Sequence, residues 1–283
     1  MKISKRKRKV RWEDGYPIVT IGGRPIRVGI IVQNGKDNPK IAKNASEQYT
    51  PLAIVLSPHK SSGVGNVCSH AAHCIDSCLD HQGMGSFGGI PGFTIHASRI
   101  ARTVLWYRER QYFLDTLHKE IALWKIKAEC AGKKLCFRPN TFSDIAWEKH
   151  GVPQAHPDIQ WYDYTKNPRR VGAVLDNYWV TFSRDSVKDD ALCAALVNSG
   201  KNVAVVFDDG RSTSTRNLHG PGKSLPSMWN GLPVFSGDDT DARWTDPRGV
   251  VVGLVLKAAS NDQRNKALES GFAVQVESEA CTN

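Results

Sequence analysis

Three closely spaced cysteines carry the clearest chemistry in the sequence. Cys68, Cys74 and Cys78 are separated by five and three residues. Thiolates are soft ligands that favour iron–sulfur clusters, zinc and copper(I). Three thiolates on one loop can bind three irons of a [4Fe-4S] cluster and leave the fourth iron open for a small molecule, water or substrate. The spacing therefore predicts a metal centre, with an iron–sulfur cluster as its preferred occupant.

Two other interpretations of these cysteines stay open at this point. A structural zinc site usually has four protein ligands, and His70, His73 or His81 would supply the fourth. The three thiols can also be free of metal. A disulfide framework is disfavoured, because the total of 7 cysteines is odd and no secretory signal is expected. The other cysteines are spread along the chain at positions 130, 136, 193 and 281.

The elements around the cysteines are expected to place them on a loop after a buried strand. Residues 51–57 (PLAIVLS) are a compact strand candidate, and residues 58–92 are rich in Gly, Ser, His and Cys without a sustained period. A loop of this length inside a compact domain is usually functional or disordered. Apolar residues then recur at three- and four-residue steps over 94–131, which predicts a helix ending at Gly132.

Strands and helices alternate through the rest of the chain. The expected strands are 134–138, 159–164, 178–182, 203–207 and 250–256, and the expected helices are 143–149 and 189–198. Apolar strands separated by helices indicate a mostly parallel sheet buried on both faces. The predicted fold is α/β, a complete or partial TIM-like barrel with a small N-terminal β extension. The expected domains are a basic arm (1–11), the β extension (12–50), the metal-binding barrel-like domain (51–260) and a C-terminal extension (261–283).

Polar residues near the ends of these strands form the predicted site. In a barrel, functional side chains gather at the carboxyl ends of the strands, although each residue taken singly is more often a cap or a surface ion pair than a site residue. The expected catalytic residues are Asp144, Asp163 and Lys166. The residues expected to bind cofactor or substrate are Arg138, Asn140, Ser143, Thr181, Ser183, Asp238, Asp241, Arg243 and Lys257.

The net charge of +10 comes mostly from the first eleven residues. These residues contain seven cations and no acid, and the rest of the chain has 31 basic and 28 acidic side chains. Such an arm favours salt-dependent binding of nucleic acid, or it is only a solvated segment. No apolar run approaches the roughly 18 residues of a membrane span, so we expect a cytoplasmic protein. The cations of the arm are Lys2, Lys5, Arg6, Lys7, Arg8, Lys9 and Arg11.

Several short motifs together resemble the phage "gene product eighty-eight" family over roughly residues 50–260. They include Leu56-Ser57-Pro58, the cysteine loop, Arg138-Pro139-Asn140, the segment 162–166 (YDYTK) and the segment 203–207 (VAVVF). The resemblance implies a phage origin and action in the cytoplasm of the infected host. It does not imply a reaction.

The cysteine loop after a first strand is also distantly similar to the radical S-adenosylmethionine enzymes, whose folds are partial barrels. The sequence departs from that family in its cysteine spacing, which is C-x3-C-x2-C there, and in lacking the Gly-Gly-Glu stretch of the second strand. Asp144 stands where the resemblance would place a ligand for the amino group of the cofactor.

These observations lead to two functional hypotheses. The first is a phage-encoded iron–sulfur enzyme whose open iron binds S-adenosylmethionine or substrate, and which acts on a nucleotide, a nucleic acid or another small molecule. The second is a non-catalytic protein that binds nucleic acid or a host factor and contains a structural zinc or iron–sulfur site. A protein ligand in the fourth metal position favours the second.

Overall fold

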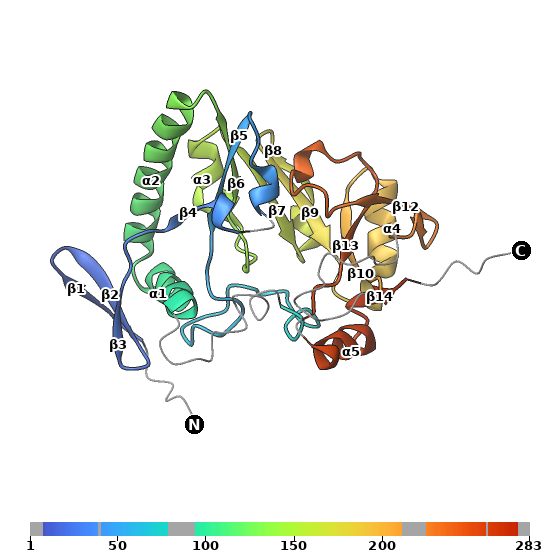
Figure 1. The fold of residues 1–283 in the computed structure, drawn as a ribbon, viewed down its shortest axis with the longest axis horizontal. Helices are drawn as coiled ribbons and strands as arrows, with labels where there is room; N and C mark the ends of the chain where they lie inside the picture. Colours follow the sequence, from blue (N-terminus) through green and yellow to red (C-terminus); the bar gives the residue numbers. More distant parts are fainter. Residues whose placement is uncertain (1–7, 39–40, 79–93, 211–224, 259, 277–283) are drawn as a thin grey trace, which may run out of the picture. The chain divides into compact units, whose positions relative to one another are not determined.

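A computed structural model shows an α/β protein with a mostly parallel, mixed sheet and a small N-terminal antiparallel sheet (Figure 1). The described residues are 8–38, 41–78, 94–210, 225–258 and 260–276. Lys2, Lys5, Arg6, Lys7, His81 and Cys281, which entered the predictions, therefore lie outside the described residues. Among the described residues, no helix combines the length and the apolarity that crossing a membrane requires.

The chain divides into two compact units. The first consists of residues 1–69, 87–163 and 175–178. The second consists of residues 70–86, 164–174 and 179–283. The cysteine loop is thus shared, because Cys68 belongs to the first unit and Cys74 and Cys78 belong to the second.

The first unit begins with the predicted β extension, an antiparallel sheet of β1 (Val10–Glu13), β2 (Tyr16–Ile21) and β3 (Arg24–Arg27). Two-residue turns connect the strands, and Asp14 and Gly15 have φ values of 50° and 77° in the first turn. Positive φ at both central positions matches the twist of a two-residue hairpin, and Asp-Gly tolerates it well. The sequence Asp-Gly therefore determines where the first hairpin turns.

The main sheet of the first unit contains four strands in the order β4-β5-β6-β7. Their bounds are β4 (Val32–Asn34), β5 (Tyr49–Ile54), β6 (Lys134–Arg138) and β7 (Gln160–Thr165). β4 is antiparallel to β5, whereas β5, β6 and β7 are parallel. Leu52, Phe137 and Trp161 are fully buried in these strands. The predicted strands at 51–57, 134–138 and 159–164 are confirmed to within a few residues.

Two long helices replace the single helix that the sequence predicted over 94–131. They are α1 (Thr94–Arg108) and α2 (Arg110–Cys130), and Glu109 between them has a non-helical backbone, with φ −132° and ψ 54°. α1 packs on β2, and α2 packs on β6 (Figure 1). α2 ends as predicted at Gly132, whose φ is 64°. The N–H groups of Gly132 and Lys133 bond to carbonyl groups of the last turn, which is a Schellman motif.

The segment after β6 is also different from the prediction. In place of a helix over 143–149, residues 139–146 have no regular helix, and a 3-10 helix (Trp147–His150) precedes the short α3 (Val152–Ala155). Trp147 is completely buried and packs with Trp106 and Phe113. Burial of this large side chain fixes the end of the irregular segment.

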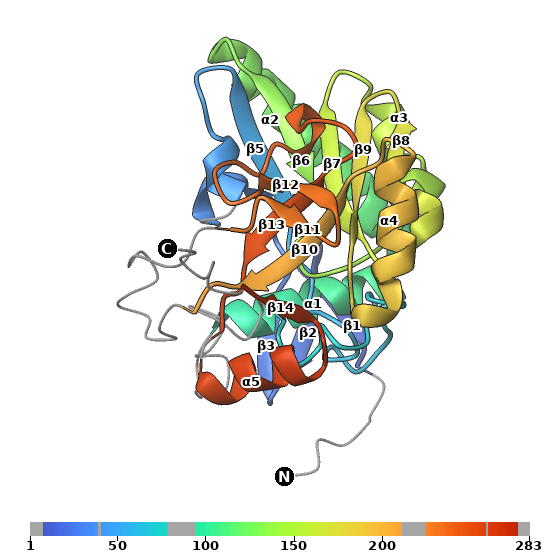
Figure 2. The ribbon, with the colours of Figure 1, turned by 90° about the vertical axis from the view of Figure 1, so that its right-hand side faces the viewer.

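The second unit contains most of the remaining strands. β9 (Tyr178–Ser183) pairs with β8 (Gly172–Leu175) and runs parallel to β10 (Val203–Asp208). The order continues from β10 to β13 (Val251–Val255), β12 (Leu232–Ser236) and β11 (Met228–Trp229), with β14 (Ala273–Gln275) also paired to β10. α4 (Asp190–Asn198) packs on β10 (Figure 2), and α5 (Asn261–Glu269) precedes β14.

The strands of the second unit are apolar because their sheet is buried on both sides. Val203 and Val205 on one face of β10, and Ala204 with its partner Val252 of β13 on the other face, are all at most 3% exposed. Near-continuous apolar strands are typical of parallel sheets covered on both faces. The predicted α/β class and mostly parallel sheet are confirmed. Closure into a barrel, and the four predicted domain limits, stay predictions.

Candidate functional site

Lys166 and Asp185 both belong to the second unit and meet just beyond the carboxyl ends of β7 and β9. Lys166 follows β7, and Asp185 lies two residues after β9. The Lys166 Nζ donates to the backbone carbonyl groups of Ser183 and Arg184, at 3.2 Å each. It also forms an ion pair with Asp185, with 3.1 Å between Nζ and Oδ1. Of the predicted residues, Lys166 and Ser183 are thus brought together.

Asp185 also holds the cysteine loop. Its Oδ2 accepts the backbone N–H of His73 at 3.0 Å and lies 2.8 Å from the His73 Nδ1. Its Oδ1 accepts the backbone N–H of Cys74 at 3.3 Å. On α5, the amide of Gln263 donates to the backbone carbonyl of Asp76 at 3.1 Å. The part of the loop that carries Cys74 is therefore anchored by side chains from distant segments.

The charge of Asp185 is stabilised by its partners. Burial alone would raise the pKa of this carboxyl, since the side chain is only 12% exposed. The ammonium group of Lys166 and the hydrogen bonds from His73 outweigh burial and hold the pKa well below its ordinary value. Asp185 is therefore a carboxylate at neutral pH.

Cys74 is a protonated thiol in the absence of a metal. Burial is the main cause that raises its pKa to about 11, and the carboxylate of Asp185 adds to the increase while Lys166 opposes it. A metal ion binds the thiolate, so metal binding at Cys74 would release this proton. Affinity for metal at Cys74 is consequently expected to increase with pH.

The donor groups of this loop fit a metal centre in their chemistry. Cys74 is a soft donor, and the Nδ1 of His73 faces a carboxylate, as in many proteins where the other ring nitrogen binds metal. In the part of the chain that the structure describes, no group of three or more His, Cys, Asp or Glu side chains is gathered as for a metal ion. The iron–sulfur and zinc assignments therefore stay predictions.

Cys68 has its own setting in the first unit. Its Sγ accepts the backbone N–H of His59 at 3.4 Å and donates to the backbone carbonyl of Phe142 at 3.2 Å. The neighbouring Val67 accepts the backbone N–H of Asp144 at 2.7 Å. The segment between β6 and the 3-10 helix, where several site residues were predicted, thus lies against Cys68.

Asn140 gives that segment its shape. Its Oδ1 accepts hydrogen bonds from the Ser143 hydroxyl (2.7 Å), the Ile145 N–H (3.0 Å) and the Trp147 indole (3.1 Å). Its amide donates to the Ile145 carbonyl and to Asp163. A side chain with this many local partners competes with helix formation. This is why the helix predicted at 143–149 does not form.

Asp163 is completely buried in the same network. Its carboxylate accepts hydrogen bonds from Asn140 and from the Tyr178 hydroxyl, the latter at 3.0 Å. Arg138, at the end of β6, is also buried. Predicted residues 138, 140, 143, 144 and 163 therefore belong to the first unit, where several of them support the backbone next to Cys68.

The remaining predicted residues are elsewhere in the second unit. Arg243 is completely buried and lies 3.3 Å from Asp246, a carboxyl whose pKa burial raises to about 6. Asp241 accepts the Tyr164 hydroxyl at 3.3 Å. The other three are at separate places: Asp238 accepts the N–H of Val255 (2.7 Å), Thr181 is buried in β9, and Lys257 is half-buried after β13.

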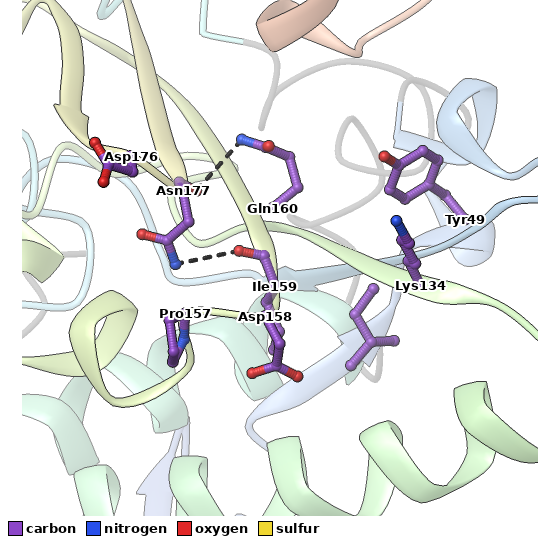
Figure 3. Close-up of a pocket in the computed structure, with 9 residues that line it drawn as sticks. Tyr49, Lys134, Pro157, Asp158, Ile159, Gln160, Asp176 and Asn177 are labelled. Atoms are coloured by element: carbon purple, nitrogen blue, oxygen red, sulfur yellow. Dashed lines mark hydrogen bonds between the residues drawn. The ribbon is translucent and has the colours of Figure 1, made fainter.

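A shallow pocket of about 310 Å³ lies at the opposite strand ends of the first unit (Figure 3). The pocket is lined by the first residues of three strands, which are Tyr49 of β5, Lys134 of β6 and Gln160 of β7. Asn177 closes another side by donating to the Ile159 carbonyl at 3.2 Å. Sites in parallel α/β sheets lie at the carboxyl ends, so this pocket is separate from the predicted site.

Two residues next to Cys74 have roles that the sequence analysis did not predict. Asp185 was not predicted, and His73 was predicted only as an alternative zinc ligand. Asp185 directly follows Ser183 and Arg184 at the end of a predicted strand, which was the available signal. Its partners are 111 and 112 positions away in the chain, so no local pattern connects them.

Comparison with models of known protein families shows which family the chain belongs to. Residues 31–275 match the model of the family described as gene product 88. The chain belongs to the gene product 88 family. The match includes the whole cysteine loop and most of each unit, and it begins after the N-terminal sheet. No curated protein and no solved structure matches the chain, and the similarity to radical S-adenosylmethionine enzymes receives no support.

Proposed function

We propose that this member of the gene product 88 family is an enzyme with a metal centre on Cys68, Cys74 and Cys78, preferably a [4Fe-4S] cluster. One observation carries the proposal: groups next to predicted site residues bind the cysteine loop in each unit. Phe142 and Asp144 contact Cys68 and its neighbour in the first unit. Asp185, paired with Lys166, binds the backbone at Cys74 in the second unit. A loop anchored in this way is pre-organised for ligands.

The protein groups in this proposal have distinct tasks. Asp185 fixes the loop backbone, and Lys166 keeps Asp185 ionised while offering a cation to an anionic substrate. A bound cluster would supply electron transfer or Lewis-acid chemistry, and its open iron is the proposed position for S-adenosylmethionine or substrate. The proposed substrates are a nucleotide, a nucleic acid or another small molecule in the cytoplasm of a phage-infected host.

His73 supports a second candidate. Its Nδ1 faces Asp185 at 2.8 Å, the arrangement that orients many zinc-binding histidines. With His73 as fourth ligand beside three cysteines, the centre would be a closed, structural zinc site. The protein would then be a non-catalytic one that binds nucleic acid or a host factor.

Anaerobic purification with metal analysis and visible spectroscopy separates the two candidates. The cluster predicts about four irons per chain and a brown protein. Cys74→Ser should lose most of this iron, whereas His73→Ala should keep it. Adding S-adenosylmethionine to the reduced protein should alter the spectrum of a cluster with an open iron.

Cys130→Ser is the matched control, because Cys130 is an exposed thiol at the end of α2. Its metal content should equal that of the natural sequence. If the protein contains stoichiometric zinc and His73→Ala loses it, the result would favour the closed zinc site and contradict the iron–sulfur cluster. Equal metal content in Cys74→Ser and Cys130→Ser would contradict both candidates.

A further inference from the structure

The N-terminal sheet presents two chemically different faces. Strand pairing places Arg11, Ile18 and Arg27 opposite one another, and it places Glu13 opposite Tyr16 on the same face. Val10, Val19 and Ile26 are opposite one another on the other face. β2 packs on α1, and Val19 of the apolar side is completely buried, so the face that carries the exposed Arg11, Tyr16 and Arg27 is the outer face. Ile18 lies between Arg11 and Arg27 on this face and is only 6% exposed.

Aromatic and cationic groups are combined on the outer face. The guanidinium carbon of Arg27 lies 3.2 Å from the centroid of the Tyr16 ring, and Tyr16 is nevertheless 42% exposed. On the opposite face, Trp12 pairs with Pro17, is 47% exposed and contacts Tyr112 edge-on, with 4.7 Å between ring centroids. Aromatic rings and guanidinium planes are the groups on which unpaired bases stack.

The sequence that forms this sheet, together with the residues before it, is strongly cationic, as binding of a polyanion requires. Residues 1–27 contain nine cationic and two acidic side chains, so they contribute +7 of the net charge of +10. Arg11 and Arg27 on this face and Lys9 just before β1 are exposed, and Arg24 is exposed on the opposite face. The Arg11–Glu13 ion pair is 3.6 Å long and more than half exposed on both sides, so it holds Arg11 only weakly.

We propose that the outer face of β1–β3 binds a single-stranded polynucleotide. Arg11 and Arg27 bind phosphates, and Tyr16, with Arg27 against its ring, stacks a base. The face has groups for phosphates and base planes, which DNA and RNA share. The exposed ring of Tyr16 can stack on an unpaired base, and a duplex does not offer unpaired bases. The binding surface is separate from the site of the proposed function, because neither the cysteine loop nor Asp185 takes part.

Fluorescence anisotropy of the full chain with a labelled oligonucleotide tests the proposal. Single-stranded DNA and RNA of one sequence should bind within a few-fold of each other, and the matching duplex should bind at least tenfold more weakly. Tyr16→Ala should weaken binding of the single strand by about tenfold, the size of one lost stacking contact. Arg11→Gln with Arg27→Gln should reduce the slope of log affinity against log salt by about 1.4.

Lys36→Gln is a control for the loss of one positive charge elsewhere, since Lys36 is an exposed cation on a 3-10 helix outside the N-terminal sheet. It should bind like the natural sequence, and thermal unfolding should verify that every variant is folded. Absence of binding at about 50 mM salt would overturn the proposal. So would preference for the duplex, or a Tyr16→Ala affinity equal to that of Lys36→Gln.

Discussion

His156 shows how a single buried side chain can make stability depend on pH. It is 8% exposed, and its Nε2 lies 2.9 Å from the Nδ1 of His118. Burial is the main cause that lowers the pKa of His156 from 6.5 to about 4, and the neighbouring Lys125 and His118 add to the decrease. The folded protein therefore holds His156 neutral at a pH where the unfolded chain would protonate it.

We expect the free energy of unfolding to decrease as the pH falls from 7 to 5. The unfolded state binds a proton at His156 below pH about 6.5, and the folded state binds it only near pH 4. This difference is worth about 2 kcal/mol over the interval. Urea unfolding at both pH values measures it, and His156→Gln should remove most of the decrease. An identical decrease in the variant would assign the effect to other groups.

At the scale of elements, one carboxylate joins α2 to the strand at the edge of the first unit. The Oε2 of Glu120 accepts the N–H groups of Ile31 at 3.0 Å and of Val32 at 2.6 Å. Both residues are at most 2% exposed. Their N–H groups would be buried without an acceptor if Glu120 were absent, and an unsatisfied buried donor costs more than an exposed one.

Glu120→Gln should reduce the free energy of unfolding by about 1–3 kcal/mol. The amide of Gln keeps the size of the side chain but has only one acceptor oxygen. Its own N–H donors would lie near the backbone N–H groups of Ile31 and Val32, which are also donors. Hydrogen exchange at the amides of Ile31 and Val32 should become faster. Asp115→Asn is the control, because Asp115 is an exposed carboxylate on the same helix. Equal effects of the two substitutions would contradict this role for Glu120.

Each unit has a hydrophobic core of its own. In the first unit, Phe113 of α2 is fully buried against Trp106 and Trp147. In the second unit, Phe207 of β10 belongs to a cluster that includes Val205 and Val251. A unit with its own core can open by itself at a lower free energy than the whole chain.

Phe113→Ala and Phe207→Ala are a matched pair for this division. Each should cost about 3–5 kcal/mol, because both rings are nearly inaccessible. Hydrogen exchange should accelerate mainly in the first unit for Phe113→Ala and mainly in the second for Phe207→Ala. Equal acceleration along the whole chain in both variants would show a single cooperative unit.

The sequence by itself determined the features that depend on neighbouring residues. Asp14-Gly15 specifies the first hairpin turn, and Gly132 specifies the end of α2. Apolar runs such as 203–207 specify buried strands, and the spacing of the cysteines specifies a candidate metal loop. Backbone conformational preferences and hydrophobic periodicity act over a few residues, so they can be detected in the sequence.

Only the tertiary structure decided which side chains meet. Asp185 contacts His73 and Cys74 across more than 110 positions, and Asn140 gathers partners that prevent a local helix. The break at Glu109 likewise divides one continuous apolar period into two helices. Such contacts depend on the packing of segments that are distant in the sequence, so the periodicity of side chains within one segment does not predict them.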